Sequence, residues 1–231
     1  MNKLAVFVFY IAFFMSSYSQ NHTIYVEYEA VKGRIINTES LIATGQKAVY
    51  QINALTQQNP NNIEADEENL SFRINQKTIR LNAKTFYLEN KHSIVYFTQN
   101  YQNKPALVKD SLPEFTWVIS NKETKKIGEF VCIKATTTFR GTNIEAWYAE
   151  RINIPFGPWK FKGLPGLILE LYTTSGSLEH TWRARKVKFQ YHNETDFNKD
   201  ESLPIIDYKT TVIEREHHFK EQMKIADSRT P

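Results

Sequence analysis

The stretch "INIPFGPWKFKGLPGLILEL", residues 152–171, contains three prolines and three glycines and then ends in an apolar run. Prolines fix φ and remove hydrogen-bond donors, so this stretch is a connector rather than the interior of a strand. Leu-Pro-Gly at 164–166 fits a type II turn, which favours proline at the second position and glycine at the third. The apolar residues 167–171 then predict a buried strand.

Large apolar side chains alternate with these glycines and prolines. Four of them are too apolar for a free loop, and we expect them to fill the core or the mouth of a curved sheet. They are Phe156, Trp159, Phe161 and Leu164. Two interpretations are open: a rigid, packed crossover, or a binding surface, since aromatic side chains supply much contact area. For a binding surface, the candidate ligand- or partner-binding residues are Trp147, Trp159, Phe161 and Leu164.

Segments on both sides of this connector alternate between apolar and polar residues with a period of two. In "HTIYVEYEAVK" (22–32) one face collects apolar side chains, while Glu27 and Glu29 lie on the other. The turn "RGTN" (140–143) joins two such segments as a hairpin. Because the order is a run of hairpins, the sequence predicts a mainly β protein (β-rich α+β) with a strongly curved antiparallel sheet or half-barrel.

The segment "LEHTWRARKVKFQY" (178–191) changes phase along its length. Trp182 shares one face with Ala184, whereas Val187 needs the opposite parity. A slip by one residue within a strand is typical of a β-bulge, which bends the strand. We therefore expect a strongly curved strand with its bulge within residues 183–188.

The C-terminal segment "YKTTVIEREHHFKEQMKIADS" (208–228) carries apolar residues at roughly helical spacing and predicts a helix. Within it, His217 and His218 are adjacent and point about 100° apart on a helix, so they do not chelate one ion. Glu214 and His218 are four residues apart and could share a face, but a solvated helix surface explains them better. We expect no metal site and no cofactor.

The N-terminal residues 1–19 have the form of a secretory signal peptide. Lys3 precedes an apolar run from Leu4 to Met15, and small residues precede a cut between Ser19 and Gln20. The run is short of the roughly 20 residues that span a bilayer. We expect an exported protein, periplasmic or secreted, with 20–231 as a single β-rich domain and no membrane span after cleavage. The net charge of +4 is spread along the chain and does not indicate nucleic acid as a partner.

Cys132 is the only cysteine, which excludes an intramolecular disulfide and any zinc site built on several cysteines. Strand alternation places it on the face of Phe130 and Lys134, as a small, half-buried apolar side chain. The sequence contains no G-x-S-x-G or G-x-G-x-x-G motif. No catalytic residue is assigned.

The letters "GLPGLI" at Gly163, Leu164, Pro165, Gly166, Leu167 and Ile168 match the signature of the GLPGLI family. The chain resembles these exported proteins, found mostly in Bacteroidetes, most strongly over residues 110–171. The resemblance implies an envelope protein of unknown activity and supplies no catalytic residues. At the level of fold alone, the strand–turn–strand pattern is also similar to periplasmic lipoprotein carriers, in which a curved sheet closes over an apolar cavity.

These observations favour a non-enzymatic envelope protein that binds an apolar small molecule or an envelope protein partner. The alternative is a hydrolase acting on envelope material, with Cys132, or with Glu145 or Glu170 beside a histidine, as the reacting group. A third hypothesis is a purely structural or assembly role, with the motif serving only the fold. Nothing in the sequence sets the ligand or the oligomeric state.

Overall fold

The structure, a computed structural model, describes residues 23–59, 63–66, 71–74, 77–81, 83–190 and 194–227. The predicted signal segment 1–19 lies outside these residues. The predicted fold class is confirmed, because the described chain is mainly β, with a strongly curved antiparallel sheet and a helix at its C-terminal end. None of the described helices has the length and hydropathy needed to cross a membrane.

Twelve strands form the main sheet, in the order β11-β12-β13-β14-β15-β1-β2-β3-β8-β9-β10-β16. Neighbours are antiparallel except β10 and β16, which are parallel. In chain order the elements are β1 (Thr23–Lys32), β2 (Ile35–Ala43), β3 (Lys47–Ile52), β4 (Leu55–Asn59), β5 (Ile63–Asp66), β6 (Ser71–Ile74), β7 (Lys77–Leu81), β8 (Lys84–Glu89), β9 (Ile94–Tyr101), β10 (Lys104–Ser111), β11 (Val118–Ile127), β12 (Phe130–Phe139), β13 (Thr142–Ala149), β14 (Leu167–Ser175), β15 (Leu178–Gln190), the 3-10 helix η1 (Glu194–Phe197), β16 (Ile205–Asp207) and α2 (Tyr208–Asp227).

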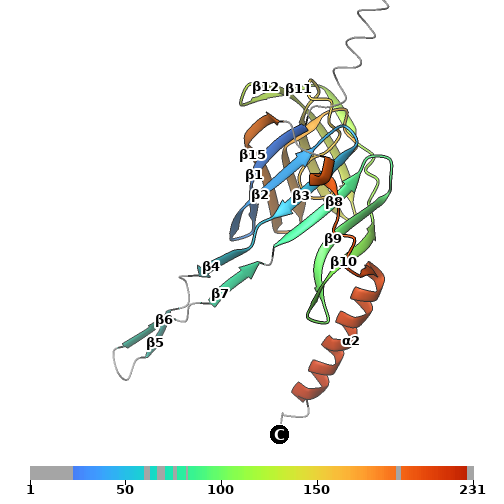
Figure 1. The fold of residues 1–231 in the computed structure, drawn as a ribbon. Coiled ribbons are helices and arrows are strands. Elements are labelled where there is room, and N and C mark those ends of the chain that lie inside the picture. The colour runs from blue at the N-terminus through green and yellow to red at the C-terminus, as the bar shows by residue number, and fades with distance from the viewer. Residues whose placement is uncertain are drawn as a thin grey trace, which may run out of the picture.

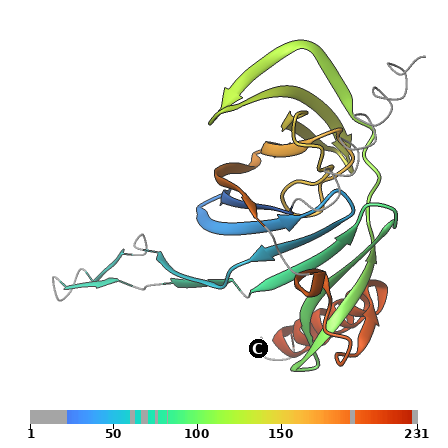
Figure 2. The ribbon, with the colours of Figure 1, turned by 45° about the horizontal axis from the view of Figure 1, so that its top comes forward.

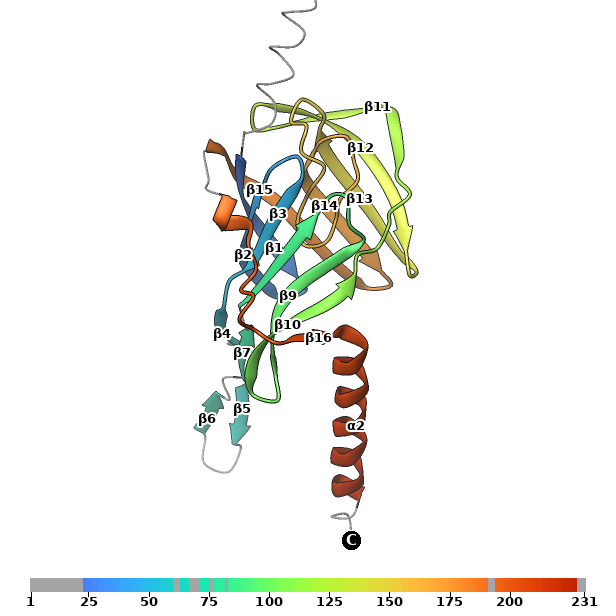
Figure 3. The same cartoon turned by 45° about the vertical axis from the view of Figure 1, so that its right-hand side comes forward.

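The main sheet curves strongly, and two appendages project from it (Figure 1). The pairs β4–β7 and β5–β6 form an arm between β3 and β8 that extends away from the sheet. Helix α2 contacts β10 and β16 and then points away from the sheet (Figure 3). The predicted helix 208–228 is thus confirmed, although Ile213 is exposed rather than packed.

Strand alternation builds the core as the sequence predicts. In β1 the apolar residues Ile24, Val26 and Tyr28 are fully buried, while Glu27 and Glu29 are half-buried on the outer face. The predicted bulge in β15 is also confirmed. Lys186 pairs with Glu27 and Ala184 with Tyr28, which leaves Arg185 as the extra residue. The bulge lets Trp182 and Ala184 on one side of it and Val187 on the other side pack against the core.

Strand β12 departs from simple alternation. Cys132 is 0% exposed and Val131 is 60% exposed, although the alternation predicts the reverse. The alternation breaks within β12 itself, because Cys132 and Ala135 are both buried although they are three residues apart. The prediction of a half-buried Cys132 is therefore wrong, because an irregularity within a strand reverses which side chains face the core.

The connector between β13 and β14, residues 150–166, lies inside the curve of the sheet (Figure 2), and we call it the plug. It runs beside β14 through hydrogen bonds from Leu167 N to Ile152 O (3.1 Å) and from Ile168 N to Phe156 O (3.0 Å). It also accepts a bond from Trp117 Nε1, at Lys162 O (3.0 Å). The plug is a packed crossover, the first of the two interpretations of its sequence.

Gly166 has a different role from the one its sequence indicates. The described glycines of positive φ include Gly163 (96°) but not Gly166, so the type II turn predicted at 164–166 is wrong. A Cβ on Gly166 would lie 2.3 Å from Ala149 O. Glycine is needed there because the two backbones touch.

Candidate functional site

A buried carboxylate joins the plug to the sheet. Glu39 of β2 is 0% exposed and accepts hydrogen bonds from Lys32 Nζ (2.5 Å), Trp182 Nε1 (2.9 Å) and the Tyr50 hydroxyl. The Lys32 ammonium also lies 5.2 Å from the centre of the Trp182 ring. A buried charge is tolerated when it is paired and its oxygens are hydrogen-bonded, and Glu39 meets both conditions.

Tyr50 connects this carboxylate to the plug. Burial, followed by the charge of Glu39 and the hydrogen bond to it, raises the pKa of Tyr50 well above its usual value, so the hydroxyl stays protonated and donates. The backbone N–H of Trp159 binds the same hydroxyl and acts in the opposite direction. Trp159 has φ 54°, an uncommon backbone conformation for a bulky residue. Glu39 is therefore an internal anchor for the plug, and its full burial keeps it from contacting a ligand.

The four predicted binding residues do not form one surface. Phe161 (3% exposed) and Leu164 (1%) belong to the core, together with motif residues Leu167 and Ile168. Trp159 is half-buried, with its ring 5.6 Å from that of Phe161.

Trp147 lies apart from the plug, half-buried on β13. Lys125 Nζ is 4.3 Å from the centre of its ring. Its Nε1 donates to Glu145 (2.8 Å), which also pairs with Lys134 (3.2 Å). A binding role for the exposed parts of Trp147 and Trp159 stays a prediction.

Glu145 and Glu170 have lysines and aromatic residues as partners, where the hydrolase hypothesis expected a histidine. Glu170 pairs with Lys125 and accepts a hydrogen bond from the Tyr172 hydroxyl (2.7 Å). Both carboxylates thus belong to a row of ion pairs across β11–β14. In the described part of the chain, no group of three or more His, Cys, Asp or Glu side chains could hold a metal ion.

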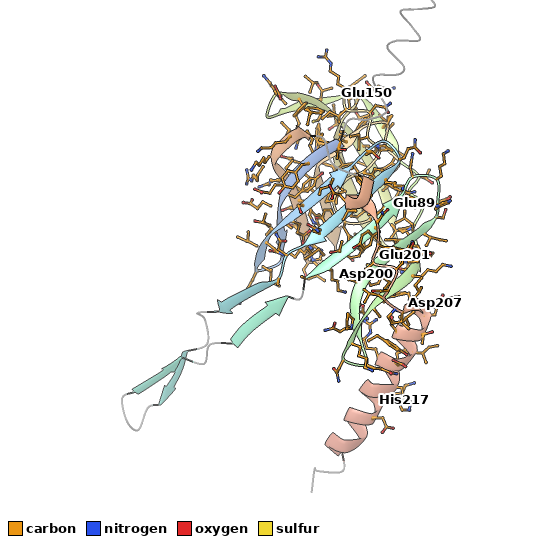
Figure 4. The ribbon with its side chains drawn as sticks, viewed as in Figure 1. Glu89, Glu150, Asp200, Glu201, Asp207 and His217 are labelled. Carbon is orange, nitrogen blue, oxygen red and sulfur yellow. The ribbon has the colours of Figure 1, made fainter. Side chains whose placement is uncertain are left out.

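A cavity of about 360 Å³ lies against β8 and β9, and we call it the tyrosine groove. Its floor contains Tyr87 and Tyr96, which are directly opposite each other on neighbouring strands. Its other polar or aromatic lining residues are Lys47, Glu89 and His92 on one wall, and Phe197 at the end of η1 with Asn198, Lys199 and Glu201 after it. Figure 4 labels Glu89 and Glu201 beside η1, whereas Glu150 and His217 lie at opposite ends of the molecule.

The groove combines aromatic rings with paired charges. Lys199 Nζ lies 5.0 Å from the centre of the Tyr96 ring and 3.8 Å from Glu201. His92 pairs with Glu89 on the opposite wall. Burial and then the nearby Asp200 raise the pKa of Tyr87, so its hydroxyl stays protonated at neutral pH and can donate a hydrogen bond.

The plug holds one wall of the tyrosine groove in place. Lys162 Nζ donates to three backbone carbonyls of the β8–β9 turn: Glu89 O (3.2 Å), Asn90 O (3.0 Å) and His92 O (3.4 Å). Two of these residues, Glu89 and His92, line the groove. Lys162, which directly precedes the GLPGLI motif, therefore positions a surface that does not include the motif residues.

A second, wider hollow of about 730 Å³ covers β11–β14, and we call it the threonine groove. Its polar lining includes the exposed Thr136, Thr138, Asn143 and Thr174 and the half-buried Glu145 and Tyr172. Tyr172 is its only aromatic lining residue. The ring of Tyr172 has Lys125 Nζ at 5.4 Å and the Arg183 guanidinium at 5.8 Å.

Comparison with known proteins decides the family. A family model described as "N-glycanase peptide, N-terminal domain" matches residues 35–210. The chain belongs to this family. The matched range contains the plug, the motif and both grooves.

Two crystal structures of PNGF-II, in space groups C2 and P21, have the same fold as this chain. Each has a TM-score of 0.55, with sequence identities of 18% and 17%. In both cases the match covers 82% of this chain and 32% of the PNGF-II chain, so this chain spans about a third of PNGF-II. No curated protein matches the sequence.

Membership of this domain family overturns the leading functional hypothesis. A non-enzymatic envelope protein that binds an apolar ligand is wrong as the interpretation of this chain, because its family is defined by a domain of an N-glycanase. The thiol version of the hydrolase alternative also fails. Burial raises the pKa of Cys132 to about 11, and its Sγ lies 3.8 Å from Phe130 O inside the core. A catalytic thiol needs exposure and a lowered pKa.

Sequence reasoning missed both Glu39 and the tyrosine groove. Alternation in β2 ("IINTESLIA", 35–43) puts Glu39 on the same face as the buried Leu41, which marks it as a charge in the core. In β8 and β9 the same alternation turns Tyr87 and Tyr96 to the outer face. Two aromatic residues on the outer faces of successive strands were the available signal. The other side of the groove, residues 197–201, which we call its roof, is about a hundred positions away in sequence. No local sequence pattern indicates that it packs over the two tyrosines.

Proposed function

We propose that this chain recognises N-linked glycans as part of an N-glycanase process. The observation that carries the proposal is the family match over residues 35–210. The fold shared with PNGF-II is consistent with it, and the chain spans about a third of that protein. Recognition of the glycan is the step of that process that we assign to this chain.

Burial and ion pairing already account for four of the reactive side chains, and the surface hollows are suited to recognition. A general acid or base must come within hydrogen-bond reach of its substrate. Glu39 and Cys132 are fully buried, and Glu145 and Glu170 are engaged with Lys134 and Lys125. What the surface does offer is two hollows with polar linings, a form suited to holding a ligand.

We further propose that the protein is exported and that it is also a member of the GLPGLI family. The signal-like residues 1–19 support export. The motif residues Gly163–Ile168 lie inside the range that the N-glycanase model matches, so the two assignments concern the same domain. Both suit a protein that meets glycoproteins outside the cytoplasm.

The test compares one carrier protein in two forms. A ribonuclease with a single N-linked glycan is immobilised beside the same ribonuclease after complete removal of the glycan, and binding of the purified chain is measured by interferometry. We expect binding to the glycosylated form that is at least about tenfold tighter than to the bare form, equivalent to about 1.4 kcal/mol. Equal binding to the two forms, or binding to neither, would overturn the proposal.

A further inference from the structure

We propose that the tyrosine groove binds an uncharged N-acetylhexosamine unit of such a glycan. The inference rests on the proposed function for the class of ligand, and on the groove itself for the place. Its volume of about 360 Å³ lies within the range of small-molecule sites, which run from about 300 to 1,000 Å³.

The floor of the groove suits the apolar face of a sugar ring. Tyr87 and Tyr96 are paired across β8 and β9, so their side chains leave the sheet next to each other on one face. Both are half-buried, which leaves part of each side chain open to the cavity. A tyrosine ring offers an apolar body with a polar tip, and a pyranose ring offers C–H groups bordered by hydroxyls.

The charges on the groove wall point to a neutral ligand. Lys47 and Lys199 balance Glu89 and Glu201, and all four line the cavity. A charged ligand would find equal numbers of like and opposite charges, so an acidic or basic peptide segment gains little there. An uncharged sugar can use both kinds of group, because each hydroxyl is a donor and an acceptor and the acetamido group is both as well.

The tyrosine groove fits this ligand better than the threonine groove does. In the threonine groove the ring of Tyr172 is shared by Lys125 and Arg183, and its hydroxyl is already bonded to Glu170. In the tyrosine groove Tyr96 is approached by Lys199, a side chain of the connection between η1 and β16. Among the cation–ring contacts of the described residues, none involves Tyr87. Its ring is therefore the better stacking surface.

The experiment measures binding of N,N′-diacetylchitobiose, a pair of N-acetylglucosamine units, by isothermal titration calorimetry. Tyr87→Ala should weaken binding about tenfold, since an aromatic contact contributes about 0.5–1.5 kcal/mol beyond its buried area. The matched control Tyr172→Ala removes the aromatic residue of the threonine groove and should leave the affinity within about twofold of wild type. Near-ultraviolet circular dichroism establishes that each variant is folded.

A second pair of variants keeps the test decisive should Tyr87→Ala fail to fold. Asn198→Ala and Glu201→Ala change exposed side chains of the roof. Each should weaken chitobiose binding about fivefold, the effect of one lost hydrogen bond of about 1 kcal/mol. Wild-type affinity in both of these variants would overturn the assignment of the groove.

The outcomes separate the two proposals. If the chain prefers the glycosylated ribonuclease but Tyr172→Ala is the variant that loses chitobiose, the proposed function stands and the tyrosine groove is wrong. If the chain binds both forms of the ribonuclease equally, the proposed function fails and the groove assignment falls with it. If the chain prefers the glycosylated ribonuclease, and only the tyrosine-groove variants lose chitobiose binding while Tyr172→Ala keeps it, both proposals are supported.

Discussion

Gly166 is a residue whose importance comes from a backbone contact. A Cβ there would lie 2.3 Å from Ala149 O and 2.8 Å from Glu150 Cα, and backbone atoms cannot move aside as a side chain can. We expect Gly166→Ala to destabilise the protein by about 3 kcal/mol or more, the upper range for overpacking. Gly45→Ala is the control, because its Cβ would meet Asn153 O at an ordinary 3.7 Å. Urea denaturation measures both, and similar midpoints would contradict the predicted contact.

Lys32 is the cation that compensates the buried carboxylate of Glu39. The Lys32→Met substitution leaves that carboxylate buried with two neutral donors, and breaking a buried pair costs about 3 kcal/mol or more. Arg185→Met breaks the exposed pair with Glu29, for which we expect about 0.5 kcal/mol. Chemical denaturation of the two variants gives the comparison. A loss in Lys32→Met as small as that in Arg185→Met would mean that Glu39 does not depend on its ion pair.

The burial of Cys132 predicts that its thiol is alkylated slowly in the folded protein. Because burial raises its pKa to about 11, the thiolate is scarce at pH 8, and the side chain is also closed to reagents. An alkylating agent at pH 8 should therefore label the folded protein only as fast as the protein unfolds, and should label it at once in denaturant. Mass spectrometry follows the reaction. Rapid labelling of the native protein would show that Cys132 is accessible after all.

At the scale of elements, the sequence predicts what depends on neighbours along the chain. The alternation of β1, the turn at 140–143, the bulge at Arg185 and helix α2 were all readable, because each follows from spacing or turn chemistry over a few residues. The reversed parity of β12 was not, since no local pattern marks the break in alternation between Cys132 and Ala135. Gly166 is a similar case. The sequence shows that a glycine is present, but it does not show that the backbone at the end of β13 lies against it.

The candidate site was harder to predict for the same physical reason. Trp159 and Phe161 drew attention because they stand beside the motif, yet Phe161 serves the core. The tyrosine groove needs β8, β9 and the residues after η1 to meet, and only the folded chain brings them together. A contact between distant segments leaves little trace in any single segment.

Lys162 links the plug to the β8–β9 turn by hydrogen bonds. Lys162→Met removes three hydrogen bonds to the turn that carries Glu89 and His92. We expect faster amide hydrogen exchange in residues 89–93 and about threefold weaker chitobiose binding, because the groove wall is less well positioned. Lys122→Met, at an exposed position of β11, is the control. Unchanged exchange in the turn would separate the plug from the groove.

On the scale of the whole molecule, one sheet wraps around its own connector. Backbone hydrogen bonds connect the plug to β14, and Glu39 and Tyr50 connect it to β2 and β3. Lys162 connects it to the β8–β9 turn. The ion pair between Lys160 and Asp110 (2.8 Å) connects it to β10. These ties join strands from both halves of the sheet. The inner side of the curve is thereby filled, which leaves the outer face for recognition.

The most direct test of this account is a nuclear magnetic resonance titration of the isotope-labelled chain with a synthetic peptide carrying one N-linked chitobiose. The unglycosylated peptide serves as the reference. We predict that the amide shifts caused only by the glycopeptide cluster in β8, β9 and residues 196–201. Shifts of equal size with the bare peptide, or glycan-dependent shifts confined to β11–β14, would contradict glycan recognition at the tyrosine groove.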